Sequence, residues 1–131
     1  MSARPFRLTA PIVGEHDLQV AFTDAMRVLA PPDVVFTSWD LANARSAVEG
    51  ARKKRRGCLP GWPDCSVWWN GQVALIELKR ERGWALSDAQ KALHPRLAAA
   101  GHPVIVAHTV PQVLAALQDR GCPLRGWVWA A

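Results

Sequence analysis

Two apolar runs joined by Asn70-Gly71 restrict the possible folds of this chain more than any other feature. The runs cover Asp64–Trp69 and Gln72–Lys79, and Asn-Gly between such runs is the strongest short-range signal for a β-hairpin with a type I′ turn. Counting back from this turn places Asp64 opposite Glu77, with Cβ atoms about 4.5–5.5 Å apart. This register holds unless a β-bulge interrupts one of the strands.

The open end of the predicted hairpin brings charged side chains together. Lys79 lies two residues after Glu77 and therefore shares its sheet face. Facing carboxylates repel each other, and a shared proton, Lys79 or a divalent cation can relieve the repulsion. Because oxygen ligands favour Mg²⁺ or Mn²⁺ over softer metals, the pattern predicts a metal site. A metal beside a lysine suits phosphodiester hydrolysis, since it activates water and stabilises charge on the phosphate.

The segments before the hairpin predict a helix and a strand. Apolar residues recur at helical spacing over Gly14–Ala30, and Pro31-Pro32 ends that helix. Asp33–Trp39 is rich in Val, Phe and Thr and predicts a strand. The residues from Leu41 to Glu49 form either a short helix or an ordered loop. We interpret residues 1–13 as a loose arm and residues 14–131 as a single domain.

The segments after the hairpin predict helix, strand and helix. Ser87 and Gln90 have the spacing of a capping box, which begins a helix that Gly101 ends. Its predicted inner face consists of Leu93, Leu97 and Ala100. A short buried strand is expected over Val104–Ala107 and a last helix over Val110–Arg120. The complete order predicts an α/β fold in which helices pack against one mixed sheet.

The first predicted helix adds a third carboxylate. Glu15 lies three residues before Leu18 and seven before Phe22, so it falls on the apolar stripe of that helix. A carboxylate on an inward face needs a partner, and Glu15 is therefore a candidate third acid of the metal site. His16 and Asp17 are possible substitutes. Alternatively, Glu15 only interacts favourably with the helix dipole.

The positive charge of the chain is concentrated in one stretch. The 131 residues carry a net charge of +5, and the segment from Arg45 to Arg56 alone, with six basic residues and one acid, has the same net charge. Gly57, Pro60 and Gly61 follow, which predicts that the stretch lies in a loop. Such a stretch just before the acids predicts phosphate contacts, with a merely solvated loop as the alternative. The predicted DNA-contacting residues are Arg52, Lys53, Lys54, Arg55, Arg56, Trp62 and Lys79.

Composition excludes several other classes of protein. Hydrophobic residues make up 50% of the chain and charged residues 21%, which argues against a disordered protein. No apolar run is long enough to span a membrane, and the N-terminus lacks the apolar block of a secretory signal. Three cysteines without a CxxC pair favour a reducing, cytoplasmic setting over a disulfide framework. A zinc site built from Cys58, Cys65 and a histidine stays an alternative.

Three short motifs resemble one nuclease superfamily. They are Gly61-Trp62-Pro63-Asp64, Ile76-Glu77-Leu78-Lys79 and Leu86-Ser87-Asp88-Ala89-Gln90. Together they resemble the PD-(D/E)XK signature and, more narrowly, the small stand-alone VRR-NUC proteins of phages and bacteria. The resemblance covers roughly residues 14–117. It implies a restriction-endonuclease-like fold with an αβββαβ core. Trp62, in the variable position before Pro-Asp, is bulkier than the family pattern leads one to expect, and Pro95 is unusual in the helix that follows.

The resemblance also implies roles for individual residues. Asp64, Glu77 and the backbone carbonyl of Leu78 would bind Mg²⁺ or Mn²⁺, with Glu15 matching the acid of the family's first helix. Lys79 would position or activate the attacking water, and Gln90 would support the site. Small members of the family resemble Holliday-junction resolvases and are often homodimers. We therefore expect a metal-dependent endonuclease that acts on branched DNA.

The same residues also have purely structural explanations. Asp64 can simply begin a strand, Glu77 and Lys79 can lie on a solvated edge, and Gln90 has a complete explanation as a capping residue. Trp62 and Trp84 flank the motifs and can stack on bases, whereas Trp127 and Trp129 can cover a core edge or a dimer interface. The alternative functions are a restriction-like or repair exonuclease and a basic DNA-binding module without metal.

Overall fold

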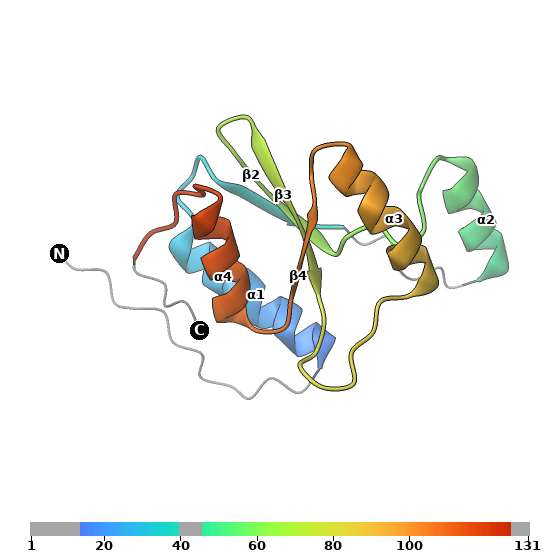
Figure 1. Ribbon diagram of the computed structural model, residues 1–131, viewed down its shortest axis with the longest axis horizontal. Helices are drawn as coiled ribbons and strands as arrows, with labels where there is room; N and C mark the ends of the chain where they lie inside the picture. The colour runs from blue at the N-terminus through green and yellow to red at the C-terminus, as the bar shows by residue number, and fades with distance from the viewer. Residues whose placement is uncertain (1–13, 40–45, 127–131) are drawn as a thin grey trace.

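The Asn70-Gly71 hairpin forms the middle of a four-stranded sheet (Figure 1). In the computed structural model, which describes residues 14–39 and 46–126, β2 (Cys65–Trp69) pairs antiparallel with β3 (Gln72–Leu78). Trp69 faces Gln72 and Cys65 faces Ile76, so the predicted register is confirmed. The φ angles of Asn70 (41°) and Gly71 (73°) are both positive, as a type I′ turn requires.

The outer strands make the sheet mixed. β1 (Val35–Ser38) pairs antiparallel with β2, and β4 (Val104–Ala107) pairs parallel with β3, which gives the order β1-β2-β3-β4. Leu78 lies beside Ala107 in the parallel pair. The C-terminal ends of β3 and β4 therefore lie side by side, so the residues that follow them, Lys79 and His108, are neighbours. The α/β class and the mixed sheet agree with the prediction from sequence.

One face of the sheet carries the main core. α1 (Glu15–Leu29) and α4 (Val110–Asp119) lie side by side across this face (Figure 1). Alternate residues of the hairpin strands point to the helices, as period-two alternation requires. The buried hydrophobic residues of this cluster include Leu18, Phe22, Ala25, Met26 and Leu29 of α1, Cys65, Val67, Ala74, Ile76 and Leu78 of the hairpin, and Val110, Val113, Leu114 and Leu117 of α4.

The opposite face of β3 carries the polar site and is approached by α3 (Asp88–Ala99). The capping box predicted for Ser87 and Gln90 is present at its start. The predicted inner face is only partly correct, because Leu93 is buried, Leu97 is half-buried and Ala100 is exposed. α3 contacts the sheet through its β4 edge, so few of its positions are enclosed.

The basic stretch lies in a helix, so the loop predicted for it from sequence is wrong. α2 (Ala47–Arg55) includes Arg52–Arg55, and Arg56 is its C-cap. Ser46 caps this helix by accepting the Glu49 N–H, and Lys53 pairs with Glu49 at 3.7 Å. Four basic side chains in the last turn also interact favourably with the helix dipole. These local interactions outweigh the turn signals that follow, and none of the residues of α2 is buried.

Several expectations fall on parts of the chain that lie outside the described residues. They are the loose arm at residues 1–13, most of the segment from Leu41 to Glu49, and the proposed coverage of a core edge by Trp127 and Trp129. Within residues 14–39 and 46–126, no helix combines the length and the apolar character needed to cross a membrane.

Candidate active site

The site is built around Glu77, a carboxylate buried in the middle of the sheet. Its side chain is only 2% exposed. Gln90, on the first turn of α3, donates its Nε2–H to Glu77 Oε1 at 2.6 Å, and Lys79 Nζ lies 3.6 Å from the same oxygen. A carboxylate is rarely buried without such partners. The structure thus brings together Glu77, Lys79 and Gln90, three of the side chains singled out from sequence.

Asp64 faces this group from the residue just before β2. Its Oδ2 accepts the backbone N–H of Leu78 at 2.8 Å, which ties the side chain across the open end of the hairpin. The Asp64 and Glu77 carboxyl groups are close enough to share a side-chain hydrogen bond when one of them is protonated. We call Asp64 and Glu77 the carboxylate pair.

The carboxylate pair is electrostatically costly without a cation. Burial, and then the charge of Asp64, raise the pKa of Glu77 to about 8, against an ordinary value of 4.5. Burial likewise raises the pKa of Asp64, although the hydrogen bond from Leu78 works against it. Lys79 lowers both pKa values but does not cancel the effect. At neutral pH, the pair therefore holds a proton or a cation.

The donor atoms fit a hard divalent metal ion. Glu77 Oε2 is buried and has no hydrogen-bond partner within the described part of the chain, so it is free to act as a ligand. Mg²⁺ is commonly held by one or two carboxylates and several waters. The pair, with the Leu78 carbonyl at the end of the same strand, supplies such a donor set. All donors are oxygens, the type that Mg²⁺ and Mn²⁺ prefer.

Glu15 lies across a hollow from the pair and not inside a three-acid cluster. It begins α1 and is exposed, so the burial expected from the helical stripe is not seen. Glu15 nevertheless lines the same hollow as Asp64, Glu77 and Lys79, and its charge adds to the effect of burial in raising the pKa of Asp64. Among the described residues, no group of three His, Cys, Asp or Glu side chains is placed to hold a metal ion. A metal role for Glu15 stays a prediction.

The zinc alternative does not agree with the structure. Cys65 points into the main core, on the other side of the sheet from Glu77, and Cys58 is half-buried near α2. Every cysteine and histidine of the chain lies in the described ranges, and these hold no three-residue cluster of metal-binding type. Burial, and then the charges of the carboxylate pair, raise the pKa of Cys65, so its thiol stays protonated.

Two hollows meet at the site. The first, of about 520 Å³, lies between α2 and the start of α3, and we call it the basic hollow. The second, of about 760 Å³, lies between α1, the end of β1 and the pair, and we call it the α1 hollow. Asp64 and Gln90 line both hollows. The carboxylate pair thus lies between the basic surface of α2 and Glu15 of α1.

Gly61 holds the Pro63-Asp64 loop against α3. Its φ angle is +81°, and a Cβ there would lie 2.6–2.7 Å from backbone atoms of Ala89 and Gln90. Gly61→Ala should therefore lower the free energy of unfolding by about 2–4 kcal/mol, because of both backbone strain and the clash. Gly57→Ala is the control, since its φ is +93° but its Cβ would meet nothing within 4 Å. Urea unfolding measures both, and equal losses would contradict close packing of Gly61.

His108 is a residue that sequence reasoning missed. Its Nδ1 lies 3.0 Å from the Lys79 carbonyl oxygen, and because a carbonyl only accepts, Nδ1 carries the proton in this contact. Its ring packs against Trp84 at a tilt of 42°, with centroids 4.5 Å apart. His108 therefore holds the backbone of Lys79 in place. The parallel pairing of β3 with β4 creates this contact. Predicting it from sequence would have required knowing that these two strands pair.

The sheet and its helices define the class of this fold. A central hairpin in a mixed four-stranded sheet, with helices packed against the sheet, is the arrangement of a restriction-endonuclease-like fold. Among solved structures, the chain is similar to a protein described as a VRR_NUC domain protein, with a TM-score of 0.60. The identity is 19%, and the match covers 81% of this chain and 86% of that one. The chain therefore has the VRR-NUC fold.

Comparison by sequence gives no further relative. No protein-family model matches the chain, and no curated protein matches it. The fold is thus established by structural similarity, and any proposal about activity has to be argued from the side chains of the site.

Proposed function

We propose that this protein is a Mg²⁺- or Mn²⁺-dependent DNA nuclease. It hydrolyses phosphodiester bonds and leaves 5′-phosphate and 3′-hydroxyl ends. The observation that carries this proposal is the buried Glu77, whose Oε2 has no partner among the described residues, opposite Asp64 and beside Lys79. A protein without catalytic use for this group has no evident reason to bury two repelling carboxylates together.

Each residue of the site would have a separate role in the reaction. Asp64, Glu77 and the Leu78 carbonyl would hold the metal, with Glu15 facing them across the α1 hollow. The metal, when bound, supplies charge that activates water and stabilises the phosphate. Gln90 fixes one oxygen of Glu77 by its hydrogen bond, which leaves Oε2 for the metal. Lys79 places a positive charge beside the pair, where it orients the attacking water and supports negative charge on the phosphate.

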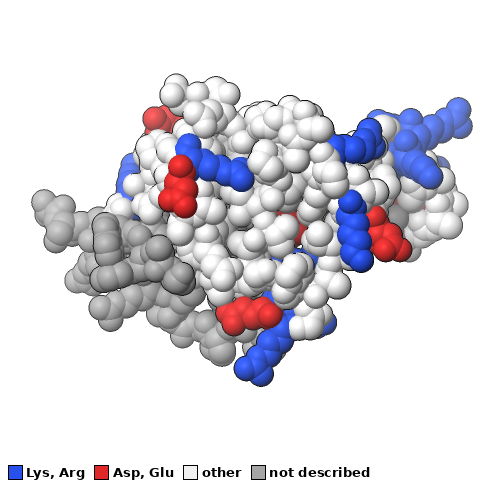
Figure 2. Space-filling view, viewed as in Figure 1, with Lys and Arg blue, Asp and Glu red and all other residues white. Residues whose placement is uncertain are grey.

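The basic side chains of α2 would bind the DNA backbone. Lys and Arg gather over α2 at one end of the molecule (Figure 2). Lys53 and Lys54 line the basic hollow together with Asp64, whereas Arg52 and Arg55 of α2 and its C-cap Arg56 are exposed to solvent. Contacts of this kind position a duplex without reading its sequence. The position of α2 beside the pair supports DNA as the substrate.

Neutralising Lys53, Lys54, Arg55 and Arg56 should weaken DNA binding and flatten its salt dependence. Each lost phosphate contact reduces the slope of log K against log salt by about 0.9 on duplex DNA. Fluorescence anisotropy at several salt concentrations measures the slope. Arg120→Gln with Arg125→Gln, which removes two positive charges away from the hollow, is the control for charge lost elsewhere and should change the slope little. An unchanged slope in the four-residue variant would show that α2 is only a solvated helix.

Branched DNA is the preferred substrate in this proposal, and the active form is a homodimer. A chain of 14.4 kDa offers little surface for holding two duplex arms, whereas a two-fold axis would present two sites to a symmetric junction. Sedimentation should show a dimer at tens of micromolar. A monomer that still cleaves four-way junctions would contradict the dimer.

One experiment separates the candidate functions. A Mg²⁺ or Mn²⁺ titration is carried out with a supercoiled plasmid, a labelled four-way junction and a labelled linear duplex. An endonuclease for branched DNA cleaves the junction at internal positions. An exonuclease shortens the linear duplex from its ends, and a DNA-binding module cleaves none of the three while still binding them.

A further inference from the structure

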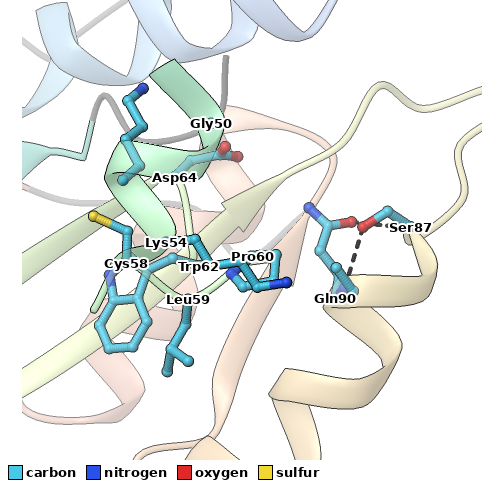
Figure 3. A pocket seen from close by; sticks show the side chains of 12 residues that line it. Gly50, Lys54, Cys58, Leu59, Pro60, Trp62, Asp64, Ser87 and Gln90 are labelled. Atoms are coloured by element: carbon cyan, nitrogen blue, oxygen red, sulfur yellow. Dashed lines mark hydrogen bonds between the residues drawn. The ribbon is translucent and has the colours of Figure 1, made fainter. Parts of the chain in front are cut away.

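The basic hollow has features that backbone contacts alone do not require. Its walls come from α2, the turn before Pro63 and the first turn of α3 (Figure 3). Apolar side chains are prominent, because Leu59, Pro60 and Trp62 line it together with the lysines. Its volume of about 520 Å³ is in the range of pockets that bind small organic ligands. A surface that only followed phosphates would need no such apolar wall.

Trp62 provides a fixed aromatic wall. Its ring packs edge-to-face on Trp39, with centroids 5.9 Å apart and an interplanar angle of 79°, and Gly61 anchors the preceding backbone against α3. An aromatic ring that packs against a second ring and lines the hollow is suited to stacking on a nucleobase.

The charges of the hollow suit the phosphate attached to that base. Lys53 and Lys54 project from α2, and Lys53 is held by its ion pair with Glu49. Asp64, at the edge toward the active site, is the acidic residue in the lining. The combination of an aromatic wall and two ammonium groups corresponds to the two parts of a nucleotide.

The hollow opens directly onto the site of chemistry. Asp64 and Gln90 line it and also line the α1 hollow, where Glu77 and Lys79 lie. Figure 3 shows Gln90 with its capping hydrogen bond to Ser87 at the edge of the hollow. A nucleotide in the basic hollow is therefore the direct neighbour of the bond beside the carboxylate pair.

We propose that the basic hollow binds one unpaired nucleotide of DNA next to the bond that is cleaved, with its base stacked on Trp62. A base within a duplex has both faces covered by its neighbours, so only an unstacked base reaches the indole face. Branch points, flaps and bulges supply such bases, whereas uninterrupted duplex does not. This inference rests on the proposed nuclease function and explains a preference for branched DNA through one subsite.

The test compares three DNA molecules in EDTA, where no cleavage occurs. They are a fully paired duplex, the same duplex with one unpaired nucleotide, and a version in which that nucleotide lacks its base. Repulsion from the metal-free carboxylates acts on all three alike. The wild-type protein should bind the bulged duplex about tenfold more tightly than the paired one, because stacking on an aromatic side chain is worth about this factor or more. The abasic bulge should lose the preference.

Substitutions then assign the preference to Trp62. Trp62→Leu should remove it, Trp62→Phe should retain most of it, and Trp68→Leu, at an exposed tryptophan outside the hollow, should leave it unchanged. Equal affinity for all three DNA molecules would overturn the proposal. A preference that persists with the abasic bulge would also overturn it, because the protein would then recognise DNA bending.

Cleavage is measured separately with Mn²⁺. A base-dependent preference in EDTA without cleavage in Mn²⁺ would contradict the nuclease function and leave the nucleotide subsite standing. Cleavage in Mn²⁺ without a base-dependent preference in EDTA would contradict the nucleotide subsite and leave the nuclease function standing. The two proposals can therefore fail independently.

Discussion

Lys79→Ala should lose at least 100-fold in DNA cleavage while binding metal and DNA much as the wild-type protein does. Lys79 is 9% exposed and touches Glu77 but is no metal ligand. Its loss therefore removes the positive group beside the attacking water, and groups that move or stabilise a proton in this way contribute about 10²–10⁴-fold. Removing a competing cation from Glu77 should leave Mn²⁺ affinity equal or higher.

Single-turnover cleavage at saturating Mn²⁺, together with calorimetric titration of Mn²⁺, measures both effects. Lys91→Ala, at an exposed lysine of α3, is the control for the loss of one positive charge. Near-normal turnover in Lys79→Ala would exclude a catalytic role for this residue. A parallel loss of Mn²⁺ binding would mean that Lys79 holds the carboxylate pair in shape.

Glu77→Gln should make the metal-free protein more stable at pH 8.5 than the wild type, by roughly 1–3 kcal/mol. The glutamine keeps an oxygen for Gln90 and presents an N–H to Asp64, so it removes the repulsion without leaving a cavity. It also removes the ion pair with Lys79, which reduces the gain. The same substitution should abolish cleavage and most of the stabilisation by Mn²⁺, because a ligand that binds only the folded state raises its stability.

The pH dependence of this effect has a definite sign. The pKa of Glu77 is about 8 in the folded protein and near 4.5 when the chain is unfolded. The folded state therefore keeps a proton that the unfolded state releases, and the free energy of unfolding in EDTA falls as pH rises from about 4.5 to 8. Glu77→Gln should show a smaller fall over this window, with Asp64 accounting for the rest.

Thermal unfolding in EDTA and in Mn²⁺, at pH 5 and pH 8.5, measures these differences. Asp64→Asn serves as the matched variant from the other side of the pair. If both variants melt well below the wild type in EDTA and keep the full shift with Mn²⁺, the carboxylate pair is not a metal site. The mixed sheet would then need another explanation for burying Glu77.

Local signals in the sequence determined the central part of this structure. The Asn70-Gly71 turn defines the hairpin, and period-two alternation then places Asp64 opposite Glu77 with Lys79 on the same face. The capping box at Ser87 and Gln90 predicted where α3 begins. Each of these features depends on residues that are close in the sequence, within one hairpin or one helical turn. Their energetics are local, so no knowledge of the rest of the fold was needed.

Only the tertiary structure decided how distant segments meet around that hairpin. The parallel pairing of β3 with β4 brings His108 to Lys79, and the packing of Gly61 on α3 brings Gln90 to Glu77. The packing of α2 makes part of the basic stretch a wall of the basic hollow. Glu15 is exposed and lines the α1 hollow opposite the carboxylate pair. Contacts of this kind follow from which faces pack together over the whole chain, and no periodicity within a single segment encodes that choice.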